Sequence, residues 1–338
     1  MNASTPARRC SARARLIFRA LVTTILALAV LTGPVRATAS TYPDHAIKIV
    51  YPYPAGGSGD SLARWIAKMM QEWLGQPVIV ENRSGASGMI GNEYVARADA
   101  DGYTLLLSIT TMIQAPALYK KQSYDVQKDF MPLALVALTP NMLVVPKESP
   151  INTLADFIAL VKREPAKHSY GSFGFGTSAH IQGELLKSQA GLDLVHVPYQ
   201  GSAPLLTNLM GNQVDAGFVD ASTGLQHVLA GKLKVLAITG SQRYEYLPEV
   251  PTFAEAGYKD FDLYGWWAMF LPAGTTPEIA EKLTVTLHKI FQSKAFAQRC
   301  KEMGIIGVGG TPAELAAIIQ HDEPVWRKII TESQIKLE

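Results

Sequence analysis

Short apolar runs alternate with amphipathic stretches along most of the chain after about residue 45. Ile47–Val50 is a short apolar run next to turn residues, a pattern that predicts a buried strand. In the segment DSLARWIAKMMQEWLG that follows residue 59, apolar side chains recur at helical spacing, and Gly75 stands where that helix should end. The pattern therefore predicts a strand, a glycine-containing turn and a helix in this order.

The same alternation continues through the rest of the chain. Further strands are predicted at 78–80, 104–108, 143–145, 169–172, 194–198, 216–219 and 234–239, and helices at 88–98, 153–163, 178–190, 203–211 and 222–230. The aromatic strand GWWAMFLPAG begins after Tyr264, and only helices are predicted beyond it, at 277–291, 294–303 and 312–332. Strands that alternate with helices indicate an α/β protein whose sheets are rich in parallel strands and covered on both faces.

The order of these elements predicts two lobes rather than one. The chain would build one lobe, cross near Asn141–Leu143 into a second, and return near Tyr264–Trp266 to finish the first. We therefore expect lobe 1 to comprise 40–142 and 266–338, and lobe 2 to comprise 143–265. Such crossings act as hinges that let lobes close on a ligand.

The first 39 residues have the composition of a cleaved secretory signal. Several arginines and no acidic residue precede the apolar block ALVTTILALAVL, and Ala37-Thr38-Ala39 fits a cleavage site. The block is shorter than the roughly 20 residues of a membrane-spanning helix, although an uncleaved anchor is the alternative. A twin-arginine route is only weakly indicated by Arg8-Arg9, because Cys10-Ser11 follows where apolar residues are expected.

Cleavage after Ala39 changes the charge and cysteine content. All six basic residues before Ser40 are arginines, so the 31 basic residues fall to 25 against 29 acidic ones, a formal charge of −4. This balance does not suggest nucleic acid or an anionic membrane as a partner. Cys10 leaves with the signal, so the remaining Cys300 has no disulfide partner in the chain and is expected in the core.

The segment YPAGGSGD, residues 53–60, is the first candidate binding turn. Gly56 and Gly57 allow bare amides to approach a ligand, and the dipole of the following helix favours an anion at the same place. A phosphate-binding P-loop would need a lysine, and a nucleophile elbow would need another glycine after Ser58, so neither pattern fits. Asp60 either caps the helix or also contacts the ligand.

A second glycine cluster, YGSFGFGTSAH at 170–180, also joins a predicted strand to a helix. It is a weak dinucleotide-binding signal and a better second anion-binding turn, in which Thr177 and Ser178 can cap the helix or donate to a ligand. His180, one turn into the helix, is either a packed or capping residue or a ligand contact.

Two more strand ends and one aromatic residue complete the candidate site. Tyr199 and Gly201-Ser202 follow one strand, and Asp220 ends another, where it could cap the next helix or face the cleft. Trp267 at the second crossing is either a packing residue or part of the pocket wall. The seven histidines show no metal-binding spacing and no catalytic group assembles, so we expect no metal, no cofactor and no enzyme activity.

These segments, in this order, resemble the Bug family, the TctC-like receptors of tripartite tricarboxylate transporters. The resemblance covers nearly all of residues 42–338. It includes YPDHAIKIVYPYPAGGSGD, LGQPVIVENRSGASGMIGNEYVARADADGYTLL, LYKKQSYDVQKDF, HVPYQGSAPLLTNLMGNQVD, LAGKLKVLAITGSQRYEYLPEVPTFAEAGY and LPAGTTPEIAEKL.

The resemblance implies a two-lobed, type II-like periplasmic-binding-protein fold that closes on a small organic carboxylate. The turn from Tyr53 to Asp60 would hold the carboxylate, and the turn from Ser172 to Thr177 would complete the site. Two departures from the family pattern, Phe175 in place of Asn and Val219-Asp220 in place of Asp-Asn, favour an aromatic or nitrogen-bearing acid over a dicarboxylate.

We therefore predict a monomeric periplasmic receptor that delivers a carboxylate to transporter subunits in the membrane. The alternatives are a ligand sensor for a signalling partner and, less favoured, a secreted α/β hydrolase. The predicted ligand-binding residues are Tyr53, Gly56, Gly57, Ser58, Asp60, Ser108, Ser172, Phe175, Gly176, Thr177, Ser178, His180, Tyr199, Gly201, Asp220 and Trp267.

The exported protein should begin near Ser40 and carry no lipid, because Cys10 precedes the apolar block rather than following a cleavage site. Intact-mass analysis of the exported protein should give the mass of the chain without residues 1–39. A mass that still includes residues 20–31 would contradict the prediction.

Overall fold

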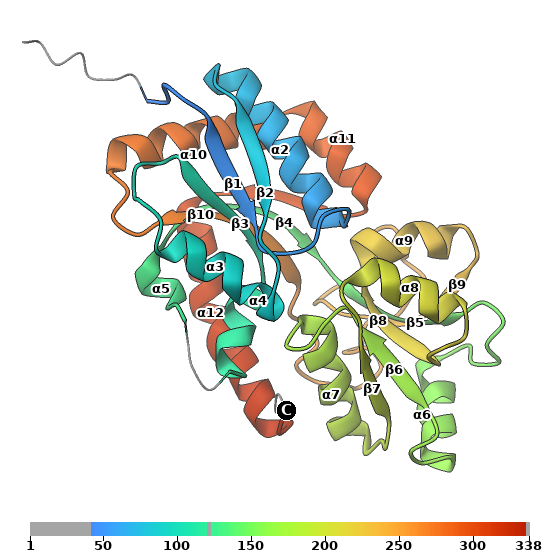
Figure 1. Ribbon diagram of the computed structural model, residues 1–338. Helices are drawn as coiled ribbons and strands as arrows, with labels where there is room; N and C mark the ends of the chain where they lie inside the picture. The colour runs from blue at the N-terminus through green and yellow to red at the C-terminus, as the bar shows by residue number, and fades with distance from the viewer. Residues whose placement is uncertain (1–41, 120–122, 336–338) are drawn as a thin grey trace, which may run out of the picture. The chain divides into compact units, whose positions relative to one another are not determined.

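The computed structural model describes residues 42–119 and 123–335, so the predicted signal peptide lies outside the described residues. From His45 onward the chain forms one compact unit by its internal contacts. This unit contains two separate β-sheets, each with helices packed against it (Figure 1). The α/β class is as predicted from the sequence.

The first sheet has six strands in the order β11-β4-β10-β3-β1-β2. Their bounds are β1 (Ile47–Tyr51), β2 (Val78–Asn82), β3 (Thr104–Ile109), β4 (Phe130–Thr139), β10 (Gly265–Pro272) and β11 (Ile306–Gly310). Strand β1 pairs in parallel with β2 and β3, whereas β10 runs antiparallel to both β3 and β4. The strand between β3 and β4 therefore comes from a distant part of the sequence.

The second sheet has five strands in the order β7-β6-β8-β5-β9. Their bounds are β5 (Asn141–Pro146), β6 (Ser169–Ser172), β7 (Val195–Pro198), β8 (Ala216–Asp220) and β9 (Leu233–Ile238). Strand β6 pairs in parallel with β7 and β8, and β5 runs antiparallel to β8 and β9. Both sheets are thus mixed, with parallel pairing confined to the strands around β1 and β6.

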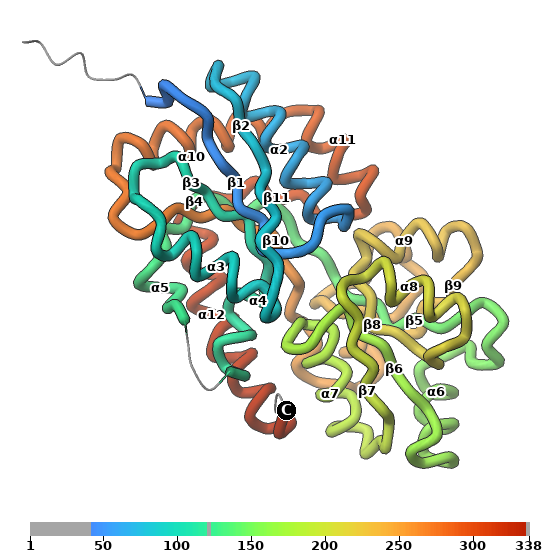
Figure 2. The backbone as a smooth tube through the Cα atoms, viewed as in Figure 1, coloured from blue at the N-terminus to red at the C-terminus, as the bar shows by residue number. Residues whose placement is uncertain are grey.

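The chain passes between the sheets twice, as the tube in Figure 2 shows. It leaves β4 at Thr139 and enters β5 at Asn141, and it returns after β9 to begin β10 at Gly265. The assignment of residues to two lobes, with boundaries near 142 and 265, stays a prediction.

The helices lie on the segments between the strands, except for α12, which follows the last strand. They are α2 (Ser58–Leu74), α3 (Met89–Ala96), α4 (Thr111–Gln114), α5 (Val126–Asp129), α6 (Leu154–Arg163), α7 (Ser178–Ala190), α8 (Ser202–Met210), α9 (Ala221–Leu229), α10 (Pro277–Phe291), α11 (Lys294–Met303) and α12 (Pro312–Glu332), with 3-10 turns η1 (Ala86–Gly88) and η2 (Ala115–Ala117). Among the described residues, none of these helices combines the length and apolarity that a bilayer crossing requires.

The expectation that only helices follow the aromatic strand was wrong, because β11 pairs with β4. Its sequence, IGVGG, is rich in glycine, which is depleted in strands. Strand β4 was also not predicted. It is an apolar run with a proline, FMPLALVALT, and such a run cannot be assigned by periodicity alone.

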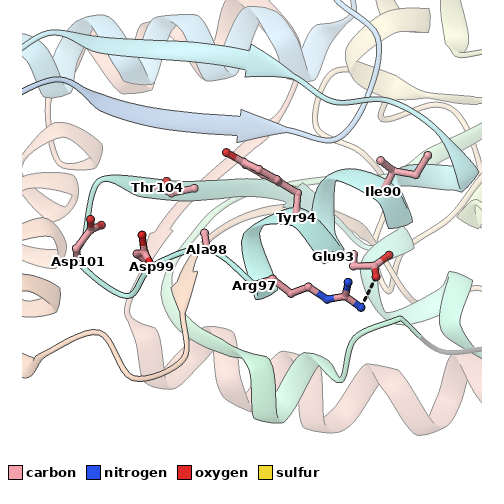
Figure 3. Close-up of a pocket in the computed structure, with 8 residues that line it drawn as sticks. All are labelled: Ile90, Glu93, Tyr94, Arg97, Ala98, Asp99, Asp101 and Thr104. Atoms are coloured by element: carbon pink, nitrogen blue, oxygen red, sulfur yellow. Dashed lines mark ion pairs between the residues drawn. The ribbon is translucent and has the colours of Figure 1, made fainter.

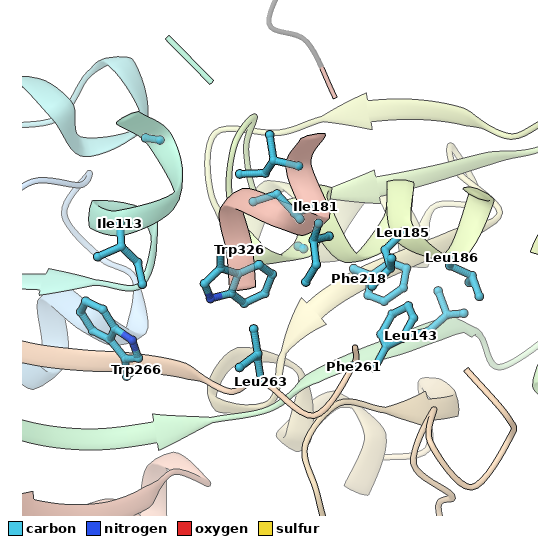
Figure 4. Close-up of a cluster of buried hydrophobic side chains, with 14 of the residues drawn as sticks. Ile113, Leu143, Ile181, Leu185, Leu186, Phe218, Phe261, Leu263, Trp266 and Trp326 are labelled. Atoms are coloured by element: carbon cyan, nitrogen blue, oxygen red, sulfur yellow. The ribbon is translucent and has the colours of Figure 1, made fainter. Parts of the chain in front are cut away.

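One buried apolar cluster includes side chains from both sheets (Figure 4). Trp266 of β10 and Trp326 of α12 belong to it, as does Phe218 of the second sheet, which stacks on Phe253 at 5.8 Å between ring centroids. Cys300 is buried as predicted, and burial raises the pKa of its thiol to about 11. The apolar packing is therefore continuous between the two sheets.

Candidate functional site

The first glycine turn follows β1 and leads directly into α2. Helix α2 begins at Ser58, earlier than the sequence pattern suggested, with Gly57 at its N-cap and no side-chain cap. Gly56 has a φ of 91°, which glycine adopts without strain. Within the described part of the chain, the amides of Ser58 and Gly59 have no acceptor, because the first amides of a helix lack intrahelical partners. They are free to bind an anion.

The carboxylate of Asp60 holds this turn in shape. It is 5% exposed and accepts hydrogen bonds from the Gly56 amide (3.0 Å), Arg64 Nε (3.0 Å) and Asn82 Nδ2 (2.9 Å). Asn82 Nδ2 also donates to the carbonyl of Tyr53 (3.1 Å). Burial raises the pKa of the Asp60 carboxyl, but the hydrogen bonds from Arg64, Gly56 and Asn82 outweigh it and leave the pKa lowered. Asp60 therefore stays ionised and supports the turn.

The second glycine turn follows β6 and leads into α7. Ser172 Oγ lies 2.7 Å from His196 Nε2, and Thr177 Oγ1 donates to the Gly174 carbonyl (2.7 Å). Thr177 is the N-cap of α7 but makes no side-chain cap bond, and no acceptor is found for the next two amides, those of Ser178 and Ala179, in the described residues. This turn has the same plan as the first, with free helix amides beside a glycine-rich bend.

Two neutral histidines, His180 and His196, contact the second turn. His180 Nδ1 accepts from the Gly176 amide (3.1 Å), so the imidazole proton must lie on Nε2. The rings of His180 and His196 are stacked at 4.1 Å between centroids, and Phe175 packs edge-on against both. Burial lowers the pKa of His180 to about 4 and that of His196 to about 3. His180 thus supports the turn as a neutral acceptor, while Phe175 stays 42% exposed.

Asp220 is the N-cap of α9, one of the two roles that the sequence left open. It accepts from the Thr223 amide (3.0 Å) and Thr223 Oγ1 (2.9 Å), and from the hydroxyls of Ser222 and Ser202. Four donors leave a carboxylate little remaining capacity to accept from a ligand. Contact between Asp220 and a ligand stays a prediction.

Tyr199, Gly201 and Ser202 lie beside the second turn. The amide of Tyr199 donates to the Ser172 carbonyl (2.9 Å), and that of Gly201 donates to the Phe173 carbonyl (3.2 Å). These bonds fix the start of α8 next to the start of α7. Gly201 is the N-cap of α8 without a side-chain cap bond.

Two contacts connect residues at or near the first turn to segments that follow strands β8 and β6 of the second sheet. Thr223 Oγ1 lies 3.4 Å from Ser58 Oγ, and Ser87 Oγ donates to the Phe175 carbonyl (2.7 Å). Because Thr223 and Ser202 both bond Asp220, the starts of α2, α8 and α9 lie close together. The structure therefore brings together the predicted residues of both glycine turns with Tyr199 and Asp220.

Trp267 lies close to Gly59 of the first turn and to Tyr51, a residue that the sequence analysis did not single out. A Cβ added to Gly59 would lie 2.0 Å from Tyr51 Oη and 2.8 Å from Trp267 Nε1. Trp267 is 4% exposed. Burial, followed by the charge of Asp220, raises the pKa of Tyr51. A close approach of three groups explains why residue 59 is glycine.

Ser108 belongs to a buried network instead of either glycine turn. Its Oγ donates to Asn92 Oδ1 (3.0 Å), and Asn92 Nδ2 donates to Tyr124 Oη (3.0 Å). This network connects β3 to α3. The Ser108 hydroxyl is bonded within it rather than to either glycine turn.

Several supporting residues were not predicted because they come from other segments. Asn82 ends β2 and pairs in register with Tyr51, and no local signal in the sequence points to it. Asn141 at the start of β5 donates to Ser178 Oγ (2.9 Å) and to Gln182 Oε1 (2.7 Å). His196 in β7 supports the second turn, as described above.

A surface groove of about 460 Å³ lies along α3 and β3 (Figure 3). Its lining includes the ion pair between Arg97 and Glu93, and the acidic side chains of Asp99 and Asp101. None of the predicted ligand-binding residues lines it. In residues 42–119 and 123–335, no group of three or more metal-ligating side chains is placed to hold an ion.

Comparison with known proteins identifies the family. Residues 62–335 match the tripartite tricarboxylate transporter family receptor, and the chain belongs to this family. It is 35% identical over 321 residues to Protein BugT of Bordetella pertussis, covering 94% of this chain and 98% of BugT.

Solved structures agree with this assignment. The periplasmic binding protein BugD superimposes with a TM-score of 0.81 at 33% identity, covering 88% of this chain and all of the BugD chain. Rpa4515 of R. palustris, solved with adipate, gives a TM-score of 0.82 at 32% identity, covering 87% and 99% of the two chains. The family resemblance predicted from the sequence is thereby confirmed.

Replacing Asp60 with Asn should destabilise the protein in a pH-dependent way. The folded-state pKa of Asp60 is lowered, so its contribution is fully present above the unfolded-state value near 3.8 and is lost as pH falls through the folded-state value. We expect Asp60→Asn to lower the free energy of unfolding by about 1–3 kcal/mol at pH 7 and by less at pH 3. Urea denaturation at both pH values measures this, and an equal loss at both would contradict it.

Proposed function

We propose that this protein is a periplasmic receptor that binds a small organic carboxylate between its two glycine turns and delivers it to a tripartite tricarboxylate transporter. Family membership supports the receptor role, and the bound adipate of Rpa4515 supports the ligand class. The periplasmic location rests on the binding protein BugD and on the signal-like residues 1–39.

The observation that carries the proposal is the pair of glycine turns with unpaired helix amides. The starts of α2 and α7 each present amides that have no acceptor in the described chain, at Ser58 and Gly59 and at Ser178 and Ala179. A carboxylate offers about four lone-pair positions in one plane, enough to accept from several such amides. Helix dipoles add to the attraction, and this arrangement does not need a cationic side chain.

A role as a ligand sensor remains a second candidate, because either partner could recognise the same ligand-bound form. Co-purification of the crosslinked complex from membranes distinguishes the two. Transporter subunits are the expected partners, and capture of a signalling kinase in their place would favour the sensor.

The ligand could be an aliphatic diacid or an acid with an aromatic end, and different observations support each. Adipate bound to Rpa4515 makes aliphatic diacids the first group to test. The exposed ring of Phe175 offers a flat apolar face to an aromatic acid. A thermal-shift screen over both groups separates them, because a ligand at a hundred times its dissociation constant adds about 2.7 kcal/mol to stability.

Replacing Gly57 with Val should weaken carboxylate binding without unfolding the protein. A Cβ at Gly57 meets no atom within 4 Å, and its φ of −81° suits any residue, so the added side chain projects into open space beside the free amides. Loss of one or two charge-assisted hydrogen bonds, each worth about 1.5–3 kcal/mol, would weaken binding by about tenfold to about twenty-thousandfold. Calorimetry with the best ligand of the screen measures this.

The matched control for this variant is Ala55→Val, an exposed position in the same turn. It should bind like the parent protein. Parent-like binding by Gly57→Val would place the carboxylate elsewhere.

Replacing Asp220 with Asn tests whether its charge affects ligand choice. If Asp220 faces the ligand, the loss of its negative charge should improve the binding of diacids relative to monoacids, because repulsion of the second carboxylate disappears. If Asp220 only caps α9, the variant should keep the ligand ranking, because asparagine caps a helix about as well as aspartate. Affinity ratios for adipate and benzoate distinguish the two outcomes.

A further inference from the structure

The loop between β2 and α3 has an unusual backbone. Four consecutive residues have positive φ: Gly85 (134°), Ala86 (45°), Ser87 (54°) and Gly88 (89°). For residues with a side chain, the left-handed region is sterically disfavoured. Strained residues persist where the surrounding structure holds them, and they are concentrated at functional sites. We therefore expect the contacts of Ser87 to hold it in this disfavoured conformation.

Ser87 contacts both glycine turns. Tyr53 Oη, from the first turn, donates to the Ser87 carbonyl (3.4 Å), and Ser87 Oγ donates to the Phe175 carbonyl of the second turn (2.7 Å). A Cβ on the neighbouring Gly88 would lie 2.7 Å from Tyr53 Oη, so the loop packs closely against the tyrosine. One residue thus connects two turns that lie more than a hundred positions apart in the sequence.

The bond from Ser87 acts on a particular peptide group. The Phe175 carbonyl and the Gly176 amide belong to the same peptide unit, and the Gly176 amide donates to His180 Nδ1 (3.1 Å). The unit is therefore fixed at its oxygen by Ser87 and at its nitrogen by His180. Its orientation sets the path of the chain into Thr177 and the first amides of α7.

We propose that Ser87 is a positioning residue of the ligand site, which aligns the second glycine turn with the first by fixing the Phe175–Gly176 peptide group. The proposal rests on the proposed carboxylate site between the turns. Ser87 acts through backbone geometry and not through ligand contact, so it should raise affinity for all carboxylate ligands by a similar factor. Ligand selectivity should not depend on it.

The test compares Ser87→Ala, Ser87→Gly and the control Ser84→Ala, an exposed serine in the same loop. Ser87→Ala removes the hydroxyl and keeps the disfavoured backbone, whereas Ser87→Gly removes the hydroxyl and relieves the backbone. In the ligand-free protein, amides of residues 172–177 should exchange with solvent about three- to tenfold faster in both Ser87 variants. Loss of one ordinary hydrogen bond gives this factor.

The same variants are then titrated with adipate and with the other acids of the screen. Both Ser87 variants should bind each acid about three- to tenfold more weakly and release it faster, with the ranking of acids unchanged. Relative to Ser84→Ala, the ligand-free melting temperatures of both variants should fall by no more than the loss of one ordinary hydrogen bond explains. A larger fall would indicate a general structural role.

Three results would overturn the proposal. One is unchanged exchange at residues 172–177 in Ser87→Ala. Another is a difference between Ser87→Ala and Ser87→Gly, which would assign the effect to backbone strain. The third is a ranking of the acids that differs between the Ser87 variants and the parent protein, which would assign a ligand contact to Ser87. If the parent protein binds no acid of the screen, the proposed function fails, but hydrogen exchange still decides the role of Ser87.

Discussion

The ionised carboxylate of Asp60 is the constraint on which the first glycine turn, and with it the proposed ligand site, depends. A charge that is almost fully buried persists only where donors surround it, and here the donors come from three different elements. The turn supplies the Gly56 amide, α2 supplies Arg64, and β2 supplies Asn82. Because these donors are not the first amides of α2, the turn is fixed while Ser58 and Gly59 stay available.

The second turn reaches the same result with a different acceptor. His180 accepts the Gly176 amide through a neutral imidazole, and burial against His196 keeps both rings uncharged over the ordinary range of pH. A protonated His180 would present a donor to the Gly176 donor, so the low pKa and the turn geometry require each other. In both turns a buried side chain accepts the hydrogen bond of a glycine amide, Gly56 in the first turn and Gly176 in the second. The first amides of the following helix therefore remain without an acceptor in the described residues, as the proposed carboxylate site requires.

The sequence predicted those parts of the structure that are encoded locally. Helices α6 and α12 agree with the predicted ranges 153–163 and 312–332, and in the structure both begin with a capping box, at Thr153 and Thr311. Both glycine turns were found because glycine clusters between a strand and a helix are a local signal. Strand directions could not be predicted, because the antiparallel pairing of β10 depends on partners more than a hundred residues away.

The same limit applies to the residues that support the site. Asn82, His196 and Ser87 reach the turns only through tertiary contacts, and nothing near them in the sequence distinguishes them from ordinary polar residues. Asp60 and Asp220 were both singled out from the sequence, but a carboxylate at a helix start fits a cap and a ligand contact equally well. Asp220 caps α9, whereas Asp60 does not cap α2. Only the geometry shows how many donors each already has.

The position of β10 in the first sheet affects how this chain can fold. Strands β3 and β4 both pair with β10, and β10 follows all five strands of the second sheet in the sequence. Until residues 265–272 have been synthesised, β3 keeps one unpaired edge and β4 has no partner strand on either side, because its other neighbour, β11, comes later still. Such edges invite pairing with other chains. Pairings so distant in sequence also form slowly. A nascent or truncated chain that ends before Gly265 cannot complete its first sheet, so it stays a substrate for chaperones and proteases until residues 265–310 are made.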